Sequence, residues 1–200
     1  MFTDQYKTIK TASEGFYKDK ASKFYSFAFP VETEEEINEH LKELRKRFFD
    51  ARHHCYAWRL GAEKTHFRAN DDGEPSNSAG APILGQIRSF DLTNILIVNV
   101  RYFGGTLLGV SGLINANKTA AAEAIKAAEI INKTVNALLS FSFDYIEMND
   151  VMKIIKDEDL KPINQTFGNN CSMQLSIRLA HINKVKERLL KVESLVFEQE

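Results

Sequence analysis

The spacing of hydrophobic and polar residues predicts alternating strands and a helix in the first third of the chain. Aromatic residues predict two strands around a polar turn, over residues 6–11 and 22–31. Thr33 with Glu36 three residues later forms a capping-box sequence, and apolar residues follow at helical spacing. In residues 54–59, His54, Tyr56 and Trp58 alternate with Cys55, Ala57 and Arg59, which indicates a strand with two different faces.

A run of apolar residues without alternation, ILIVNV at 95–100, predicts a strand that is buried on both faces. An alanine-rich segment, 115–128, follows it after a glycine-rich stretch and predicts a helix. The sequence INKTVN at 131–136 separates this helix from a new pattern. We therefore expect two domains, residues 1–131 and residues 137–200.

The second domain has the strand and helix order βαββαβ, which is typical of ferredoxin-like folds. With the first domain, this gives an α+β protein. The expected elements are a strand at 137–145, a helix at 149–156, strands at 161–167 and 171–180, a helix at 183–192 and a strand at 195–197.

Charge and cysteine content restrict the functional classes. Lys plus Arg number 26 and Asp plus Glu number 27, so no overall charge attracts nucleic acid. Cys55 and Cys171 lie far apart in the sequence and form no disulfide framework, which fits a reducing cytoplasm. The N-terminus lacks the pattern of a signal peptide, and no apolar stretch reaches the roughly 18 residues of a membrane span.

The first chemistry-bearing motif is DDGEPSNSAG at 71–80. Asp71, Asp72 and Glu74 place three carboxylates within four residues, an arrangement that coordinates a cation or accepts hydrogen bonds from nearby donors. A simpler interpretation is a tight turn in which Gly73 supplies the positive φ. The motif also precedes a predicted helix start, where unpaired backbone N–H groups can bind an anion.

The second motif is RYFGGTLLGVSGL at 101–113. Arg101 ends the buried strand, where its charge is costly unless it is paired, and we expect a carboxylate of the first motif to be its partner. The glycines allow the backbone to approach a ligand, or equally serve close packing of a helix on the sheet. Neither a phosphate-loop nor a dinucleotide-binding pattern is present, so no nucleotide cofactor is expected.

Neighbouring His53, His54 and Cys55 do not predict a metal site. Adjacent residues of a strand point to opposite faces, and no second pair of Cys or His with ligand spacing occurs elsewhere in the sequence. His66 is expected to be a solvated histidine in a polar loop. We therefore predict neither a metal nor any other cofactor.

Three motifs in this order, DARHHCYAW at 50–58 and the two described above, resemble the IMPACT family, including its bacterial YigZ-type members. The resemblance implies an N-terminal βαβ-rich domain like domain IV of elongation factor G and a ferredoxin-like C-terminal domain like its domain V. The likeness to two adjacent elongation-factor domains implies a role in translation. Eukaryotic relatives restrain a kinase that acts on translation initiation. The chain departs from the family pattern at Asn77-Ser78, Ser111 and Asn117, where Gly-Thr, Gly and Tyr are usual.

Three functional hypotheses remain from the sequence. The leading one is a regulatory protein that binds the ribosome, RNA or a translation-related protein, with no membrane or DNA partner. The second is a hydrolase that uses the clustered carboxylates and Arg101, and the third is a purely structural network. No catalytic residue is assigned; the expected ligand- or phosphate-binding residues are Asp71, Asp72, Gly73, Glu74, Ser76, Gly80, Arg101, Tyr102, Gly104, Gly105, Gly109, Ser111 and Gly112.

Overall fold

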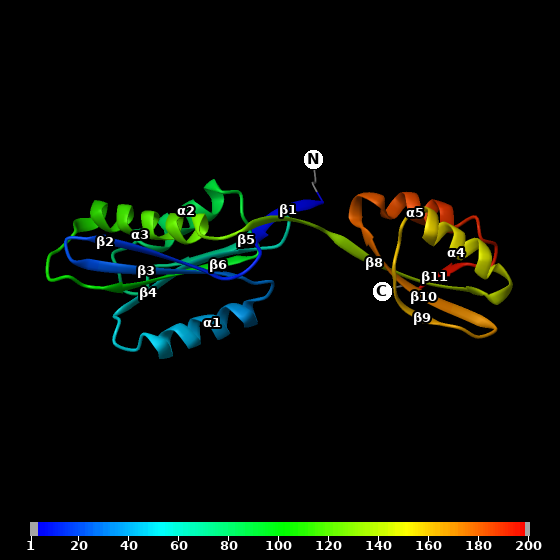
Figure 1. Ribbon diagram of the computed structural model, residues 1–200, viewed down its shortest axis with the longest axis horizontal. Helices are drawn as coiled ribbons and strands as arrows, with labels where there is room; N and C mark the ends of the chain where they lie inside the picture. Colours follow the sequence, from blue (N-terminus) through cyan, green and yellow to red (C-terminus); the bar gives the residue numbers. More distant parts are fainter. Residues whose placement is uncertain (1–3, 199–200) are drawn as a thin grey trace. The chain divides into compact units, whose positions relative to one another are not determined.

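The computed structural model describes residues 4–198 and shows a mixed α+β protein (Figure 1). The chain divides into two compact units, residues 1–133 and residues 134–200. None of the helices within the described residues is long and apolar enough to cross a membrane.

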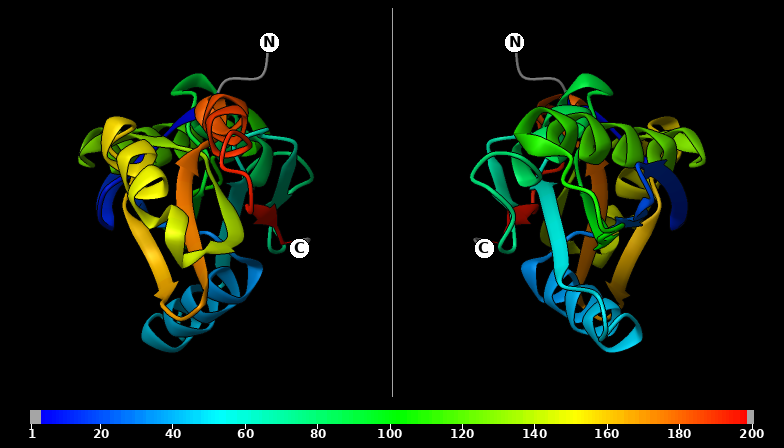
Figure 2. Two further views of the ribbon diagram at one scale, coloured as in Figure 1. Left: turned by 90° about the vertical axis from the view of Figure 1, so that its right-hand side faces the viewer. Right: turned by 90° about the vertical axis from the view of Figure 1, so that its left-hand side faces the viewer.

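A five-stranded antiparallel sheet forms the centre of the first unit, with the strand order β2-β3-β6-β4-β5. The helix α1 covers one face, and α2 and α3 cover the other (Figures 1 and 2). The elements are β2 (Ser13–Asp19), β3 (Ser22–Pro30), α1 (Glu34–Arg47), β4 (His53–Leu60), β5 (His66–Asn70), α2 (Gly80–Ser89), β6 (Ile95–Tyr102) and α3 (Gly109–Lys126).

The central strand β6 confirms the prediction from the apolar run, because every residue from Ile95 to Arg101 is buried. Its alternate side chains fill two separate cores. Ile95 and Ile97 pack under α2 and α3, whereas Leu96 and Val98 pack under α1. The strand therefore needs apolar residues on both faces.

The antiparallel pairing also explains why the two motifs meet. Strands β5 and β6 both pair antiparallel with β4, so they run in the same direction and their carboxyl ends lie at the same end of the sheet. Each then leads through a loop into a helix on the same face, β5 into α2 and β6 into α3. Residues 71–79 and 103–108 consequently lie at the same end of the sheet.

The start of α1 follows the predicted capping sequence with one difference. The Thr33 hydroxyl accepts from the Glu36 backbone N–H at 3.3 Å, as expected for an N-cap. The Glu36 carboxylate accepts from the backbone N–H of Glu32 at 2.6 Å, one residue before the N-cap.

Three elements differ from the sequence-based expectations. Residues 4–31 contain three strands instead of two, because β2 forms over the segment expected to be a polar turn. His66 begins the edge strand β5 instead of lying in a loop, although it is exposed. The α3 helix starts at Gly109, six residues earlier than the alanine-rich segment indicates. The sequence pattern misses its first turn because that turn contains two glycines, which disfavour a helix.

The predicted boundary segment 131–136 is also more ordered than a linker. It contributes to β7 (Ile130–Thr134), which pairs with β1 (Gln5–Ile9) in a separate two-stranded sheet. The Lys10 backbone N–H additionally donates to the Glu129 carbonyl at 2.9 Å.

The second unit has the predicted βαββαβ order, with a four-stranded antiparallel sheet arranged β11-β8-β10-β9. Phe141, Phe143 and Leu175 from this sheet pack with Val185 and Leu189 of α5 in one core. The elements are β8 (Asn136–Asp144), the 3-10 helix η1 (Tyr145–Glu147), α4 (Met148–Asp157), β9 (Pro162–Thr166), β10 (Asn170–Arg178), the 3-10 helix η2 (Leu179–His181), α5 (Ile182–Leu189) and β11 (Val196–Phe197).

Candidate functional site

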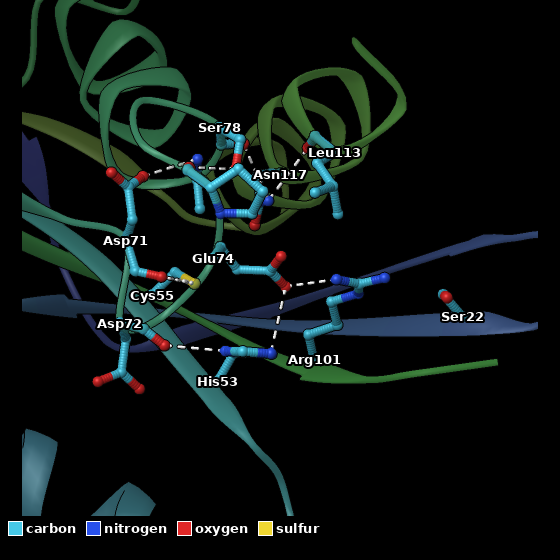
Figure 3. A network of polar contacts seen from close by, with 12 residues as sticks. Ser22, His53, Cys55, Asp71, Asp72, Glu74, Ser78, Arg101, Leu113 and Asn117 are labelled. Carbon is cyan, nitrogen blue, oxygen red and sulfur yellow. Dashed lines mark hydrogen bonds and ion pairs between the residues drawn. The ribbon is translucent and has the colours of Figure 1, made fainter. Parts of the chain in front are cut away.

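The candidate site lies at the end of the first unit's sheet where the loops 71–79 and 103–108 follow β5 and β6 (Figure 3). We call residues 71–79 the acidic loop and residues 103–108 the glycine-rich loop. The α2/α3 face of the sheet provides the floor of the site, with His53 and Cys55 from β4 and Arg101 from β6.

A buried ion pair joins the two motifs. An Arg101 Nη1 donates to Glu74 Oε1 at 2.5 Å, and the two side chains are only 8% and 3% exposed. This confirms the prediction that Arg101 pairs with a carboxylate of the first motif. His53 Nε2 lies 3.9 Å from the same Glu74 oxygen. Because both charges have left water, removing either partner would leave the other uncompensated.

Asp71 caps the helix α2. Its Oδ1 accepts from the backbone N–H groups of Ala79 at 2.9 Å and Gly80 at 2.8 Å, while Oδ2 accepts from Asn77 N–H at 2.8 Å. The N-cap residue itself, Ala79, has no side chain that could do this. Asp71 therefore supplies from a distance both the hydrogen bonds and the negative charge that stabilise a helix N-terminus.

Asp72 connects the acidic loop with β4 and with α1 on the opposite face of the sheet. Its carboxylate accepts from the His54 backbone N–H at 2.7 Å and from Arg45 of α1 at 2.8 Å. Burial alone would raise the pKa of Asp72, but these hydrogen bonds outweigh it and hold the pKa below its usual value. The carboxylate is thus ionised near neutral pH.

His53 and Cys55 also contact the acidic loop. His53 Nδ1 lies 2.8 Å from the Asp72 carbonyl, and the Cys55 thiol donates to the Asp71 carbonyl at 3.0 Å. Burial, reinforced by the nearby carboxylates, raises the pKa of Cys55, which keeps it a thiol. Among residues 4–198, no group of three or more His, Cys, Asp and Glu side chains is arranged to hold a metal.

A second buried polar network lies between β6 and α3 and was not predicted from the sequence. Asn99 Nδ2 donates to the backbone carbonyl and to the Oδ1 of Asn117, at 3.0 and 3.1 Å. Asn117 Nδ2 donates in turn to the carbonyls of Ser78 and Leu113. The single asparagine in the apolar run ILIVNV is the signal that could have revealed it.

The glycine-rich loop is held close to the β2–β3 turn at one point. A Cβ on Gly104 would lie 2.1 Å from the carbonyl carbon of Ala21, so only glycine fits there. The Gly104 N–H donates to the Ser22 hydroxyl at 3.1 Å. Further along, Gly109 has φ +72°, which favours glycine at the start of α3.

Most of the glycine-rich loop is otherwise exposed. Leu107 is 82% exposed and Phe103 is 56% exposed. Within the described residues, no side chain accepts a hydrogen bond from the N-terminal N–H groups of α3, in contrast to α2, which Asp71 caps. Its first N–H groups therefore remain available to an external acceptor.

Arg101 lies against this same region. Its Cζ atom is 5.5 Å from the ring centroid of Phe24 and 5.8 Å from that of Phe103. Phe24 packs with Leu108 and Leu113 at the beginning of α3. Although Nη1 binds Glu74, the buried Arg101 Nε has no hydrogen-bond partner in the described part of the chain.

The remaining predicted site residues are packed against the protein in some cases and exposed in others. Gly80 and Gly104 are packed against backbone, whereas Tyr102 points to the α1 face, where its hydroxyl donates to Asp50 at 2.6 Å. This hydrogen bond, with burial, raises the pKa of Tyr102 to about 12. The predicted residues that are exposed on the two loops and the first turn of α3 are Gly73, Ser76, Gly105, Gly109 and Ser111, and Gly112 is partly buried.

The chain is similar to several known proteins along most of its length. It is 29% identical to the IMPACT family member YvyE of Bacillus subtilis, over 91% of this chain and 84% of the relative. It is 28% identical to the IMPACT family member YigZ of Escherichia coli, over 85% of this chain and 84% of the relative.

A solved structure described as the crystal structure of a hypothetical protein has the same architecture. It aligns with a TM-score of 0.75 and 25% identity, over 99% of this chain and all of that chain. The family profile described as the Impact N-terminal domain matches residues 20–125, which include both loops of the candidate site. The chain belongs to the IMPACT family.

Proposed function

We propose that this chain is a translation-associated regulatory protein that binds structured RNA of the ribosome through its glycine-rich loop. The uncapped N-terminus of α3 beside the buried Arg101 is the observation that carries this proposal. Backbone N–H groups at a helix N-terminus, together with the helix dipole, suit a phosphate group.

The surroundings of α3 support a ligand that carries both phosphate and aromatic groups. Phe103 is exposed next to Arg101, so a base could contact the ring while a phosphate contacts the helix N-terminus. Glu74 already balances the charge of Arg101, which leaves the N–H groups of Gly109 and its neighbours as the main phosphate donors. With a net charge of -1, the attraction is local and its salt dependence modest.

The bonding of the acidic motif favours binding over catalysis. Asp71 accepts three backbone hydrogen bonds, Asp72 is held by Arg45, and Glu74 is buried against Arg101. Each carboxylate thus has a structural partner that a hydrolytic reaction would have to displace. A general base needs a free lone pair within reach of its substrate.

The connection with translation rests on membership of the IMPACT family and on the family's likeness to two domains of an elongation factor. A cytoplasmic location belongs to the same proposal because ribosomes are the proposed partner. The buried cysteines Cys55 and Cys171, which form no disulfide, are compatible with it.

Co-sedimentation with ribosomes at low and moderate salt tests the proposal. The informative variant is Ser111→Asp, which places a carboxylate in the exposed first turn of α3, where it stabilises the helix but competes with phosphate. The matched control is Asn115→Asp, which adds the same charge to an exposed position beyond that turn.

We expect the wild type and Asn115→Asp to pellet with ribosomes at low salt, and Ser111→Asp to remain in the supernatant while it stays folded. Two results would overturn the proposal. One is a folded wild type that never pellets at low salt. The other is turnover of a small substrate that Asp72→Asn abolishes, which would support the hydrolase hypothesis instead.

A further inference from the structure

Four aromatic rings gather on the α1 face of the first unit's sheet, on the opposite face from Glu74 and Arg101. Phe16 of β2, Tyr25 of β3, Tyr102 of β6 and Phe48, which follows α1, form what we call the aromatic platform. Ring centroids of Phe16 and Tyr25 lie 5.1 Å apart, and Tyr25 lies 6.1 Å from Tyr102 and 6.2 Å from Phe48.

The strand register places these rings together. Phe16 pairs with Tyr25 across β2 and β3, and Tyr102 lies one row further along, paired with Lys23. Because side chains alternate along a strand, these residues share one face. The helix α1 ends at Arg47, so this end of the sheet is only partly covered.

The platform borders an open hollow of about 370 Å³. Phe16 is 49% exposed and Phe103, at the rim, is 56% exposed, so part of each of these two rings is accessible. The residues that line the hollow are Ala21, Lys23, Tyr25, Phe48, Tyr102 and Phe103.

Two lysines lie in the β2–β3 pair beside the rings. Lys18 and Lys23 are exposed and directly opposite each other in the β2–β3 pair, an arrangement of like charges that destabilises a sheet. An anion bound between them would relieve this repulsion. The neighbouring carboxylates are partly engaged: Glu14 pairs with Arg47 at 3.7 Å, and Asp50 accepts from the Tyr102 hydroxyl.

We propose that the aromatic platform binds a single-stranded segment of RNA, with bases on the rings and the phosphate backbone along Lys18 and Lys23. Stacking rings beside cations are the features that single-stranded nucleic acids require. This inference rests on the proposed RNA-binding function and adds the part of the RNA that is recognised.

Phe103 connects the platform with the glycine-rich loop. Its ring lies 5.8 Å from the Arg101 Cζ on one side and lines the hollow with Tyr25 and Tyr102 on the other. A strand of RNA could therefore pass around the end of β6, with a phosphate at α3 and the following bases on the platform. A docking surface for an apolar protein segment would not require the opposed lysines.

Fluorescence anisotropy with a labelled oligouridine of twelve nucleotides at low salt tests the platform directly. The ring variants are Phe16→Ala and Phe16→Leu, of which the second keeps the apolar volume without the ring. Phe67→Ala is the matched control, because Phe67 is 44% exposed on β5 and has the Arg88 Cζ 4.4 Å from its ring centroid. Thermal unfolding of each variant shows that it is folded.

We expect both Phe16 variants to weaken oligouridine binding by about 5- to 150-fold per lost base contact. Phe67→Ala should bind like the wild type. Lys18→Gln combined with Lys23→Gln should reduce the slope of log affinity against log salt by about 1.4, since two phosphate contacts are lost. Lys42→Gln combined with Lys46→Gln, two exposed lysines of α1, is the charge control.

The outcomes separate this inference from the proposed function. If the wild type fails to bind oligouridine, or if folded Phe16 and lysine variants bind it unchanged, the platform is not an RNA site, whatever Ser111→Asp does to ribosome binding. If duplex RNA binds as well as oligouridine and depends equally on Phe16, recognition of single strands is wrong. Loss of oligouridine binding in the platform variants alone supports the inference even when Ser111→Asp still sediments with ribosomes.

Discussion

The acidic loop and the glycine-rich loop lie at the same end of one sheet, and each leads into a helix, yet they use their polar groups in opposite ways. In the acidic loop, all three carboxylates bind other parts of the protein: Asp71 binds α2, Asp72 binds Arg45 and Glu74 binds Arg101. The glycine-rich loop is fixed at Gly104 and leaves the start of α3 uncapped. The acidic loop therefore stabilises the structure around the site, whereas the glycine-rich loop leaves backbone N–H groups exposed at the start of α3.

The largest expected effect tests the acidic side of this comparison. Arg101→Ala should lower the free energy of unfolding by about 3–5 kcal/mol, because Glu74 would remain buried without a partner. Urea denaturation measures it. In double-mutant cycles, Glu74→Gln should couple with Arg101→Ala by about 0.5–3 kcal/mol, and more strongly than Asp72→Asn does. Additive effects at Glu74 and Arg101 would contradict the buried pair.

A smaller loss is expected when the cap of α2 is removed. Asp71→Ala should lower the free energy of unfolding by about 2 kcal/mol, since three backbone N–H groups lose their acceptor. Ser76→Ala, at an exposed position in the same loop, is the control and should stay within about 0.5 kcal/mol of the wild type. Equal effects of the two substitutions would show that the cap contributes nothing.

The stability of the first unit should also depend on pH, through the buried side chain of His54. Burial lowers the pKa of His54 below 6.5, so the unfolded chain binds a proton more readily than the folded one. Stability should therefore fall as pH drops through about 6.5. Urea denaturation at pH 7.5 and 5.5 should show this loss in the wild type and in His66→Gln, and a smaller loss in His54→Leu. The same loss in His54→Leu as in wild type would exclude His54 as its source.

The glycine-rich side predicts a small change. Leu107→Ser should alter the free energy of unfolding by no more than about 0.5 kcal/mol, because the side chain is 82% exposed. A loss similar to that of Asp71→Ala would mean that the glycine-rich loop is also structural, and the contrast between the loops would disappear.

Removing the second unit should leave both loops unchanged. We expect a chain ending at Asn136 to unfold cooperatively, since residues 1–133 form a compact unit with their own cores. Its circular dichroism and urea transition provide the measurement. An aggregated or unfolded product would show that the two units are not independent domains.

Local patterns were sufficient to predict the second unit and the central strand. The hydrophobic alternation of residues 137–145 and 171–180 anticipated β8 and β10 to within two residues, because one face of their sheet is buried under α4 and α5. The run ILIVNV likewise anticipated β6, and the end of a buried strand made a partner for Arg101 necessary.

Other contacts depend on packing between distant segments. Arg101 pairs with Glu74, and neither Asp71 nor Asp72 takes that place, because of the direction of each side chain in the folded loop. The Asn99–Asn117 network depends on α3 crossing β6, and the aromatic platform depends on the register of β2 against β3. No local spacing contains this information. Whether the exposed loop residues bind phosphate stays a prediction.

The pairing of β1 with β7 has a consequence for the order in which the protein can fold during synthesis. Lys10 and Glu129, at the edge of this small sheet, are separated by 119 positions in the chain. A contact of such length closes only after the intervening segment is available, and it contributes little to the early folding steps. During synthesis, β1 therefore cannot pair with β7 until nearly the whole first unit has left the ribosome.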